Sequence, residues 1–286
     1  MLTALDHVVV AVRDLESATA TYGALYGRRP SWHGVHPGWG TANTLFRLAN
    51  TYVELIAAMG EGPFGDALRG HLDAHGEGPY ALAFATADAD ACAAALRGHG
   101  IGAPDPTPGS GRDADSGAER RWRNLFLAPA DTRGVPIFVI EHQSAPAALP
   151  PAAVVGDARA AIDGIDHVVV MTADAEAAIA LYRDRLGLRL AFDRIFEQRG
   201  LRLLFFRIAG ITVELAAPLG ASPTPDRFWG ISYRVGDIEA ARARVLAAGF
   251  EVSEIRPGNK PGTRVCTVRR ETYGVATLLI AAVAAE

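Results

Sequence analysis

The chain has 286 residues, of which 49% are hydrophobic and 21% charged, and its formal net charge is −4. This is an ordinary soluble composition, and without a basic cluster with interleaved aromatic residues it argues against nucleic acid binding. Two cysteines exclude a disulfide framework, no apolar run approaches the roughly 18 residues that span a bilayer, and we see no signal-peptide pattern. We expect a cytoplasmic protein of about two domains.

The first predicted elements form a β-α-β-β-β unit. Residues 5–12 are rich in valine and predict a strand. Asp14 stands where the N-cap of a helix is expected, and Gly27 stands where that helix ends. Three further strands complete the unit, at residues 28–35, 43–48 and 52–57.

A second unit of the same order follows. Residues 60–78, rich in glycine and polar, predict a linker between the units, and residues 103–117 predict a long loop. Residues 144–161 are rich in alanine and proline and predict the interdomain linker. The regular elements of this unit are expected at residues 80–86 (strand), 89–99 (helix, capped by Asp88), 121–127 (strand) and 135–142 (strand).

The rest of the chain repeats this pattern. Residues 5–10 (LDHVVV) recur as residues 165–170 (IDHVVV), and Glu54 recurs as Glu214 at the same offset of 160 residues. A repeat of this length without a net gap indicates a duplicated folding unit. A fourth unit at residues 228–282 echoes the second. The predicted domains are therefore residues 1–145 and 163–286, each a pair of units, joined by a linker at 146–162.

Three motifs carry a family resemblance: Asp6-His7-Val8 before a strand–helix unit, Tyr22 with Gly27 at the helix end, and Val53-Glu54-Leu55 on a later strand. They resemble the vicinal oxygen chelate superfamily, which includes glyoxalase I, extradiol dioxygenases, methylmalonyl-CoA epimerase and the bleomycin resistance proteins. The run His36-Pro37-Gly38-Trp39-Gly40-Thr41 is also similar to a glyoxalase-like group. The resemblance implies an α+β fold, in which four β-α-β-β-β units pair into two open, U-shaped mixed sheets with flanking helices.

The resemblance also implies a divalent metal, held by a histidine on the first strand and a glutamate on the fourth strand of each unit in a pair. In the first half these positions are His7 and Glu54. The partner positions fall on Ala81 and Phe138, neither of which can bind a metal. Glu141 is the candidate third ligand, provided that a one-residue slip or bulge turns it inward.

Without that slip, His142 is the substitute donor. The second half keeps His167 and Glu214 as a weaker second site, because its partner positions fall on Gly230 and on Leu278 or Ala281. A firm metal site needs at least three protein donors. The alternative for each His–Glu pair is a hydrogen bond within a polar patch of the sheet.

Other residues are candidates for substrate binding. Trp39 and Trp229 are suited to stacking a planar ligand, and Arg123 to pairing with an anion. Asn43 lies inside a predicted strand, and Ala81 leaves room for a cavity. His36, in a Pro/Gly turn, is expected at the surface.

These residues support two hypotheses about function. The first is an enzyme of the vicinal oxygen chelate type, with isomerase or lyase chemistry on a small oxygenated metabolite, in which the metal stabilises an enolate or oxyanion and Glu54 or Glu141 moves a proton. The alternative is a metal-free protein that binds or sequesters a small molecule, as the bleomycin resistance proteins do. Neither involves nucleic acid or a membrane, and a homodimer is left open.

Overall fold

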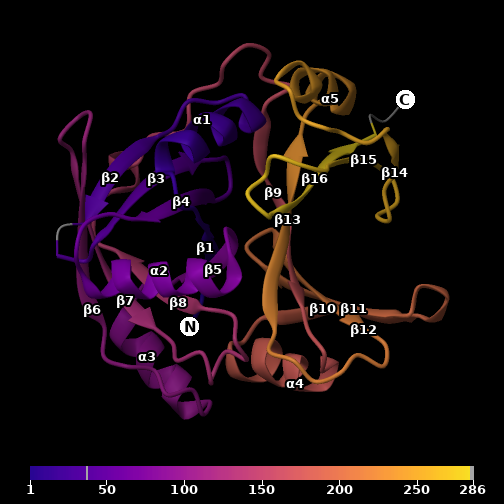
Figure 1. Ribbon diagram of the computed structural model, residues 1–286. Helices are drawn as coiled ribbons and strands as arrows, with labels where there is room; N and C mark the ends of the chain where they lie inside the picture. Colours follow the sequence, from indigo (N-terminus) through magenta and orange to yellow (C-terminus); the bar gives the residue numbers. More distant parts are fainter. Residues whose placement is uncertain (37, 284–286) are drawn as a thin grey trace.

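The computed structural model describes residues 1–36 and 38–283, and it shows two halves, each built on one mixed β-sheet (Figure 1). The order of the elements confirms the prediction of four β-α-β-β-β units in two pairs. No helix in the described part of the chain is long and apolar enough to cross a membrane.

The sheet of the first half closes into a barrel, whereas the sequence predicted an open sheet. The closing contact joins β2 to β6, where Gly34 pairs with Asp113 and Val35 with Arg112. Around the barrel the strands are β1 (Ala4–Ala11), β4 (Tyr52–Ala58), β3 (Thr41–Arg47), β2 (Trp32–His36), β6 (Thr107–Asp113), β7 (Glu119–Phe126), β8 (Ile137–His142) and β5 (Gly78–Ala85).

Strand β6 lies within residues 103–117, so the prediction of a loop there is wrong over 107–113. Two of its glycines allow the indole of Trp122, on the neighbouring strand β7, to lie against the backbone. A Cβ atom at Gly109 would stand 2.3 Å from Nε1 of Trp122, and one at Gly111 would stand 3.1 Å from the same ring system. These glycines are needed because an aromatic ring lies against the backbone of the strand, and not because the chain turns there.

This contact gives a stability prediction. Gly109→Ala should destabilise the protein by about 1–3 kcal/mol, because the new Cβ displaces Trp122 from a packed position. Gly70→Ala is the matched control: it lies inside a helix with no atom near its Cβ position, and it should stabilise by about 0.5–1 kcal/mol. Thermal or urea unfolding measures both. A Gly109→Ala protein as stable as the wild type would contradict this packing.

The predicted linker at residues 60–78 contains helix α2 (Pro63–His75), so that prediction is also wrong. Pro63 is favourable at the first helical position. Leu68 and Leu72, one helical turn apart, bury themselves against Ala11 of β1 and its neighbours. Because this segment is rich in glycine, the helical spacing of its two buried leucines was not recognised in the sequence. In Figure 1 the helix lies across the face of the first half.

The remaining helices of the first half follow the predictions more closely. Helix α1 (Leu15–Tyr26) starts at Asp14, whose side chain accepts a hydrogen bond from the backbone N–H of Ser17, and ends at Gly27 in the left-handed region with φ 64°. Helix α3 (Ala89–Gly98) starts at Asp88 in the same way. These caps satisfy backbone groups that a helix end leaves unpaired.

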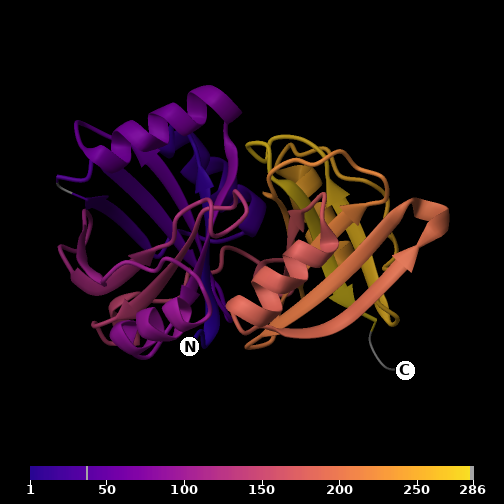
Figure 2. The ribbon, with the colours of Figure 1, turned by 90° about the horizontal axis from the view of Figure 1, so that it is seen from below.

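The sheet of the second half stays open, as predicted. In Figure 2 it stands beside the barrel, with the strands of residues 189–208 reaching away from the first half. Its helices are α4 (Ala175–Ile179), which continues as a π-helical turn η2 (Ala180–Arg185), and α5 (Ile238–Ala247). Its strands, in spatial order, are β10 (Arg189–Phe196), β11 (Leu201–Ile208), β12 (Ile211–Pro218), β9 (Ile162–Met171), β13 (Arg227–Val235), β16 (Ala276–Ala282), β15 (Thr263–Val268) and β14 (Arg256–Pro257).

The two halves share one apolar core. At its centre the hydroxyls of Tyr26 and Tyr233 are hydrogen-bonded at 2.8 Å, and both side chains are buried. The segment predicted as a linker packs along the first half. Its backbone N–H at Ala152 donates to the carbonyl of Arg47, and it includes the short 3₁₀ turn η1 (Pro146–Ala148). A second 3₁₀ turn, η3 (Glu197–Arg199), joins β10 to β11.

Candidate functional site

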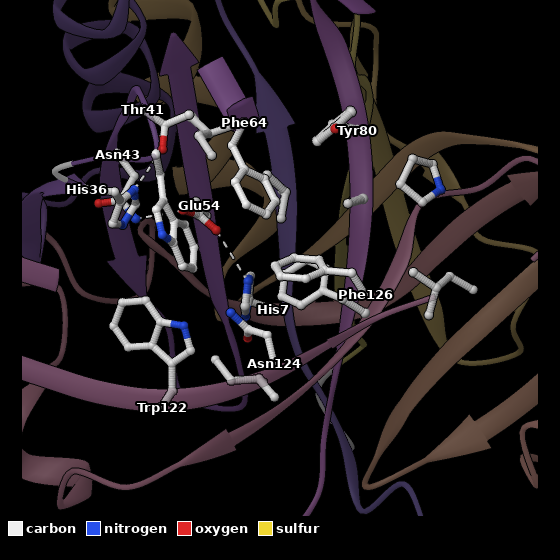
Figure 3. Close-up of a pocket in the computed structure, with 18 of the residues that line it drawn as sticks. His7, His36, Thr41, Asn43, Glu54, Phe64, Tyr80, Trp122, Asn124 and Phe126 are labelled. Atoms are coloured by element: carbon white, nitrogen blue, oxygen red, sulfur yellow. Dashed lines mark hydrogen bonds and ion pairs between the residues drawn. The ribbon is translucent and has the colours of Figure 1, made fainter. Parts of the chain in front are cut away.

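A cavity of about 180 Å³ lies inside the barrel of the first half (Figure 3). Pairing between strands explains which side chains reach it. Val9 of β1 pairs with Glu54 of β4 on one side and with Ala81 of β5 on the other, and His7 pairs with Tyr52. Residues at paired positions, and every second residue along a strand, point to the same face of a sheet. His7, Val9, Tyr52, Glu54 and Ala81 therefore line the cavity together.

His7 and Glu54 form the polar centre of the cavity. Nε2 of His7 lies 3.3 Å from Oε2 of Glu54, and Nδ1 of His7 lies 2.7 Å from Oδ1 of Asp6. The other oxygen of Glu54 accepts a hydrogen bond of 2.6 Å from Nδ2 of Asn43. The ring of His7 stacks on Tyr52 with 4.3 Å between ring centroids. The geometry holds both ionisable groups in place and leaves them facing the cavity.

These contacts determine the charges of the pair. Burial acts to lower the pKa of His7, but the hydrogen bonds to Asp6 and Glu54 outweigh it and raise that pKa above its usual value. Burial acts to raise the pKa of Glu54, but the hydrogen bonds from His7 and Asn43 outweigh it and lower that pKa. The pair is therefore an imidazolium beside a carboxylate. A second histidine, His142, lies 2.9 Å from Asp6.

Aromatic rings form much of the remaining wall. Trp39 stacks on Phe64 of α2 at 4.8 Å, Phe64 meets Phe126 at 5.1 Å, and Phe126 meets Phe138 at 5.4 Å. Phe138 then reaches the edge of His7 at 5.3 Å. Helix α2 thus contributes an aromatic side chain to the cavity, which suits a flat ligand.

The turn residue His36 is in the cavity wall, and the prediction of a surface position is wrong. It is 8% exposed, and its Nδ1 lies 2.9 Å from the hydroxyl of Thr41. Burial lowers the pKa of His36, and the charges of Glu54 and Arg120 both act on it. His36 is therefore a neutral polar group that lies near both of these charged residues.

Arg120 is the other charged residue of the cavity. Along β7 the side chains of Arg120, Trp122, Asn124 and Phe126 line it at every second position. Arg120 is 7% exposed, and its guanidinium carbon lies 5.5 Å from the ring centroid of Trp32, 5.8 Å from Tyr52 and 6.0 Å from Trp122. Within residues 1–36 and 38–283 its side chain has no hydrogen-bond or ion-pair partner.

Two amide oxygens at the cavity are also unpartnered. Oδ1 of Asn43 and Oδ1 of Asn124 are buried and accept no hydrogen bond from the described residues. Buried polar atoms are satisfied in most native structures, so these two oxygens are exceptions among the described residues.

The structure brings together five of the residues that the sequence singled out: His7, Trp39, Asn43, Glu54 and Ala81. It places three others elsewhere. Glu141 accepts a hydrogen bond of 3.1 Å from the backbone N–H of Ala89 at the start of α3, and Arg123 lies beside Asp90 and Glu141. Trp229, 42% exposed, belongs to the second half.

Strand parity explains the position of Glu141. Phe138 and Ile140 of β8 line the cavity, and Glu141 between Ile140 and His142 faces the helix outside. The bulge that would turn Glu141 inward is absent from the paired part of β8 that the structure describes, where residues 138–142 oppose β7 without a shift. Glu141 is therefore not available to the cavity as a metal ligand or a catalytic base.

The equivalent pair of the second half is arranged differently. Nε2 of His167 lies 2.7 Å from the hydroxyl of Ser232 and 3.7 Å from Glu214, while Nδ1 lies 2.8 Å from Asp166. Burial raises the pKa of Glu214. Ser232 thus satisfies the histidine nitrogen that would otherwise face the glutamate.

The donor set does not fit the divalent metal that the resemblance implies. His7 and Glu54 are two protein donors, and the two remaining family positions are the apolar Ala81 and Phe138. No group of three His, Cys, Asp or Glu side chains that could hold a metal ion occurs among the residues described. A firm site needs at least three protein donors. The weaker pair of His167 and Glu214 falls short for the same reason.

We therefore expect protein purified without chelator to contain well below one equivalent of any divalent transition metal, measured by plasma mass spectrometry. Dialysis against EDTA should leave its ligand binding and stability unchanged. Two matched variants test whether either carboxylate binds a metal. Glu141→Gln and Glu54→Gln should both have the same metal content as the wild type. One equivalent of metal that is lost in Glu54→Gln would contradict this interpretation of the donor set.

Several residues of the cavity escaped the sequence analysis. The alternation of Arg120, Trp122, Asn124 and Phe126 along one strand was a period-two signal that could have identified the inward face of β7. The others carry no local signal, because they come from separate elements. These are Thr41, Tyr52 and Phe64.

Comparison with known proteins agrees with the fold. Residues 5–162 match the family model of the glyoxalase-like domain, and residues 166–267 match that of the glyoxalase/bleomycin resistance protein/dioxygenase superfamily. The ethylmalonyl-CoA/methylmalonyl-CoA epimerase of Cereibacter sphaeroides is 32% identical over 100 residues, which cover 32% of this chain and 75% of the relative.

Two solved structures share the whole architecture. A variant of 4-hydroxymandelate synthase from Streptomyces coelicolor has a TM-score of 0.73 at 13% identity, covering 100% of this chain and 95% of the other. A hypothetical protein from Staphylococcus aureus has a TM-score of 0.66 at 10% identity, covering 96% of this chain and 98% of the other. At these identities the likeness shows the fold alone. On the match of residues 5–162, which is more than half of its length, the chain belongs to the glyoxalase-like family of the vicinal oxygen chelate superfamily.

Proposed function

We propose that the barrel cavity of the first half binds a small oxygenated molecule, and that Glu54 and His7 move a proton on it in an isomerase reaction. The observation that carries this proposal is a buried carboxylate–imidazolium pair in the wall of a cavity that is otherwise lined mainly by apolar and aromatic side chains. Paired acid and base groups with shifted pKa values in a cavity are typical of proton-transfer sites.

The geometry assigns a role to each member of the pair. The Glu54 carboxylate takes a proton from a carbon next to a carbonyl group, and the electrons of the broken C–H bond move onto the carbonyl oxygen. The His7 imidazolium donates a hydrogen bond from Nε2 to that oxygen. Glu54 then returns this proton to another carbon atom of the enolate, or to the opposite face of the same carbon once the enolate has turned over in the cavity, and both side chains regain their initial state.

Neighbouring residues keep this pair oriented. Asp6 holds Nδ1 of His7, so that Nε2 is directed to Glu54 and the cavity, and Asn43 holds the second oxygen of Glu54. Tyr52 fixes the plane of the imidazole by stacking. The step needs no metal, which agrees with the two-donor set.

The curated relative supports the class of reaction. By its name it is an epimerase. An epimerase inverts one stereocentre, and removal and return of a proton at carbon accomplishes this. The cavity limits the reacting part of the substrate, because its volume of about 180 Å³ is close to the ~150 Å³ of an engineered cavity that takes up benzene.

Proton exchange into the substrate tests the proposal. The protein is incubated in D₂O with methylmalonyl-CoA and with small aromatic and aliphatic 2-oxo and 2-hydroxy acids, and loss of the C–H signal is followed by NMR. We expect exchange with at least one compound, well above the buffer rate. The proposal fails if the wild-type protein exchanges none of them faster than buffer does.

A second candidate function is metal-free binding or sequestration of a small molecule. The chain of aromatic rings from Trp39 to Phe138 favours it, because such a wall binds flat ligands without chemistry. A binding protein would retain a ligand without exchanging its protons, so the same NMR experiment separates the two functions.

A further inference from the structure

We propose that Arg120 recognises an anionic group and that the cavity takes a flat carboxylic acid. This inference rests on the proposed function in that both concern the same cavity. It starts from the observation that the Arg120 side chain is 7% exposed, lines the cavity and has no hydrogen-bond or ion-pair partner in residues 1–36 and 38–283.

A buried charge without a partner is costly, and arginine is seldom buried unless it is paired. The carboxylates near the cavity centre contact histidines and not Arg120. Glu54 and Asp6 face His7, and His142 adds a further contact to Asp6. None of the carboxylates in the described chain is paired with Arg120, so its guanidinium has no direct ion-pair partner there.

Three aromatic rings surround this guanidinium at cation–π distance: Trp32, Tyr52 and Trp122. Rings attract a cation through their faces but leave its N–H donors unsatisfied. A planar guanidinium with free N–H groups fits a carboxylate, which accepts two parallel hydrogen bonds. The surrounding aromatic wall restricts the body of the ligand to a flat and mostly apolar group.

A second unsatisfied group lies on the same strand. Oδ1 of Asn124 is buried and accepts no hydrogen bond from the described residues, and Asn124 follows Arg120 on the inward face of β7 after Trp122. Asn124 stands four residues from Arg120 along the strand, on the order of 13 Å, so its amide adds polarity to the wall without adjoining the guanidinium. The chemical class is therefore an aromatic or unsaturated acid.

Binding of matched acids and amides tests this inference. The probes are benzoate, trans-cinnamate and 4-hydroxyphenylacetate, each compared with its neutral amide, in a chloride-free buffer. Affinity is measured by ligand-observed NMR and by tryptophan fluorescence, since Trp39 and Trp122 line the cavity. We expect at least one acid to bind about tenfold or more tightly than its amide, on the scale of hydrogen bonds to a charged group.

Substitutions at two neighbouring arginines provide the contrast. Arg120→Leu should remove the preference for the acid and leave affinity for the amide within about threefold. Arg123→Leu should keep the preference, because Arg123 lies outside the cavity beside Asp90. Arg120→Gln, which keeps a polar side chain, replaces the leucine variant if that protein does not fold.

The inference is overturned if no acid binds more tightly than its amide to the wild type, or if the preference survives in both Arg120 variants. Its failure can be distinguished from failure of the proposed function. Glu54→Gln protein should keep the preference for acids even though proton exchange is lost. If the protein exchanges substrate protons but shows no Arg120-dependent preference for acids, only this inference is overturned. If it prefers acids but exchanges no protons, only the proposed function is overturned.

Discussion

Glu54→Gln should slow proton exchange on the substrate by about 10²–10⁴-fold, the usual contribution of a positioned general base. Glutamine has nearly the same shape and still accepts the hydrogen bond from Asn43, so the cavity is retained. It cannot take up a proton at neutral pH. Its amide also presents N–H groups toward Nε2 of His7, which removes one of the two carboxylates that favour the protonated histidine.

Deuterium exchange measured by NMR reports this loss, and ligand affinity measured in parallel should change far less. Glu141→Gln is the matched control, because the same substitution is made on a carboxylate that faces helix α3 and not the cavity. Equal losses in the two variants would show that the effect comes from stability or net charge. A Glu54→Gln protein with full exchange activity would rule out Glu54 as the base.

His7→Ala should have the largest effect on stability, about 3–5 kcal/mol, which is the scale for removing one partner of a buried ion pair. The substitution leaves Glu54 buried beside Asn43 alone and removes one of the two histidines that face Asp6. It also leaves Tyr52 without its stacking partner. Urea unfolding at pH 6 measures the difference in free energy of unfolding between variant and wild type.

The difference should depend on pH in a defined direction. The pKa of His7 is raised by folding, so its contribution is complete below the ordinary value of 6.5 and is lost as the pH rises through the folded-state pKa. The pKa of Glu54 is lowered by folding, so its contribution is present above the ordinary value of 4.5 and is lost as the pH falls through the folded-state pKa. The cost of His7→Ala is therefore greatest between these two values.

His167→Ala is the matched control in the second half. His167 also contacts the preceding aspartate, but it lies in an open sheet and is hydrogen-bonded to Ser232, with Glu214 3.7 Å away. We expect its loss to cost much less than the loss of His7. Equal costs at pH 6, or a cost of His7→Ala that does not change with pH, would contradict the assigned charges.

The family resemblance in the sequence was sufficient to place His7 beside Glu54, and the order of elements came from the patterns of each unit. The caps at Asp14, Asp88 and Gly27 were predictable because they depend on residues adjacent in the chain. The four-unit order followed from the repeat, since a duplicated unit folds in the same way twice. Pairing between neighbouring strands then brought the two family positions together across β1 and β4.

Strand parity on β7 and β8 was decided only by the tertiary structure. A shift of one residue along a strand moves a side chain to the opposite face of the sheet. This distinguishes Arg123, which the sequence analysis chose, from Arg120, which lines the cavity, and it places Phe138 inside and Glu141 outside. The local sequence is compatible with either set of side chains facing the cavity, and packing against the neighbouring strands selects one set.

Three further features could not be predicted from the sequence alone: helix α2, the closure of the barrel and the shortage of metal donors. Glycine is common in loops, but in β6 it makes room for Trp122, and in α2 it accompanies Leu68 and Leu72, which are buried only because strand β1 lies beneath them. A metal site requires donors from several strands to converge within one coordination sphere. The sequence by itself determined the order of the four units and the pair His7–Glu54. The three-dimensional arrangement of the strands decided what surrounds that pair, because convergence is a property of distances between elements far apart in the chain.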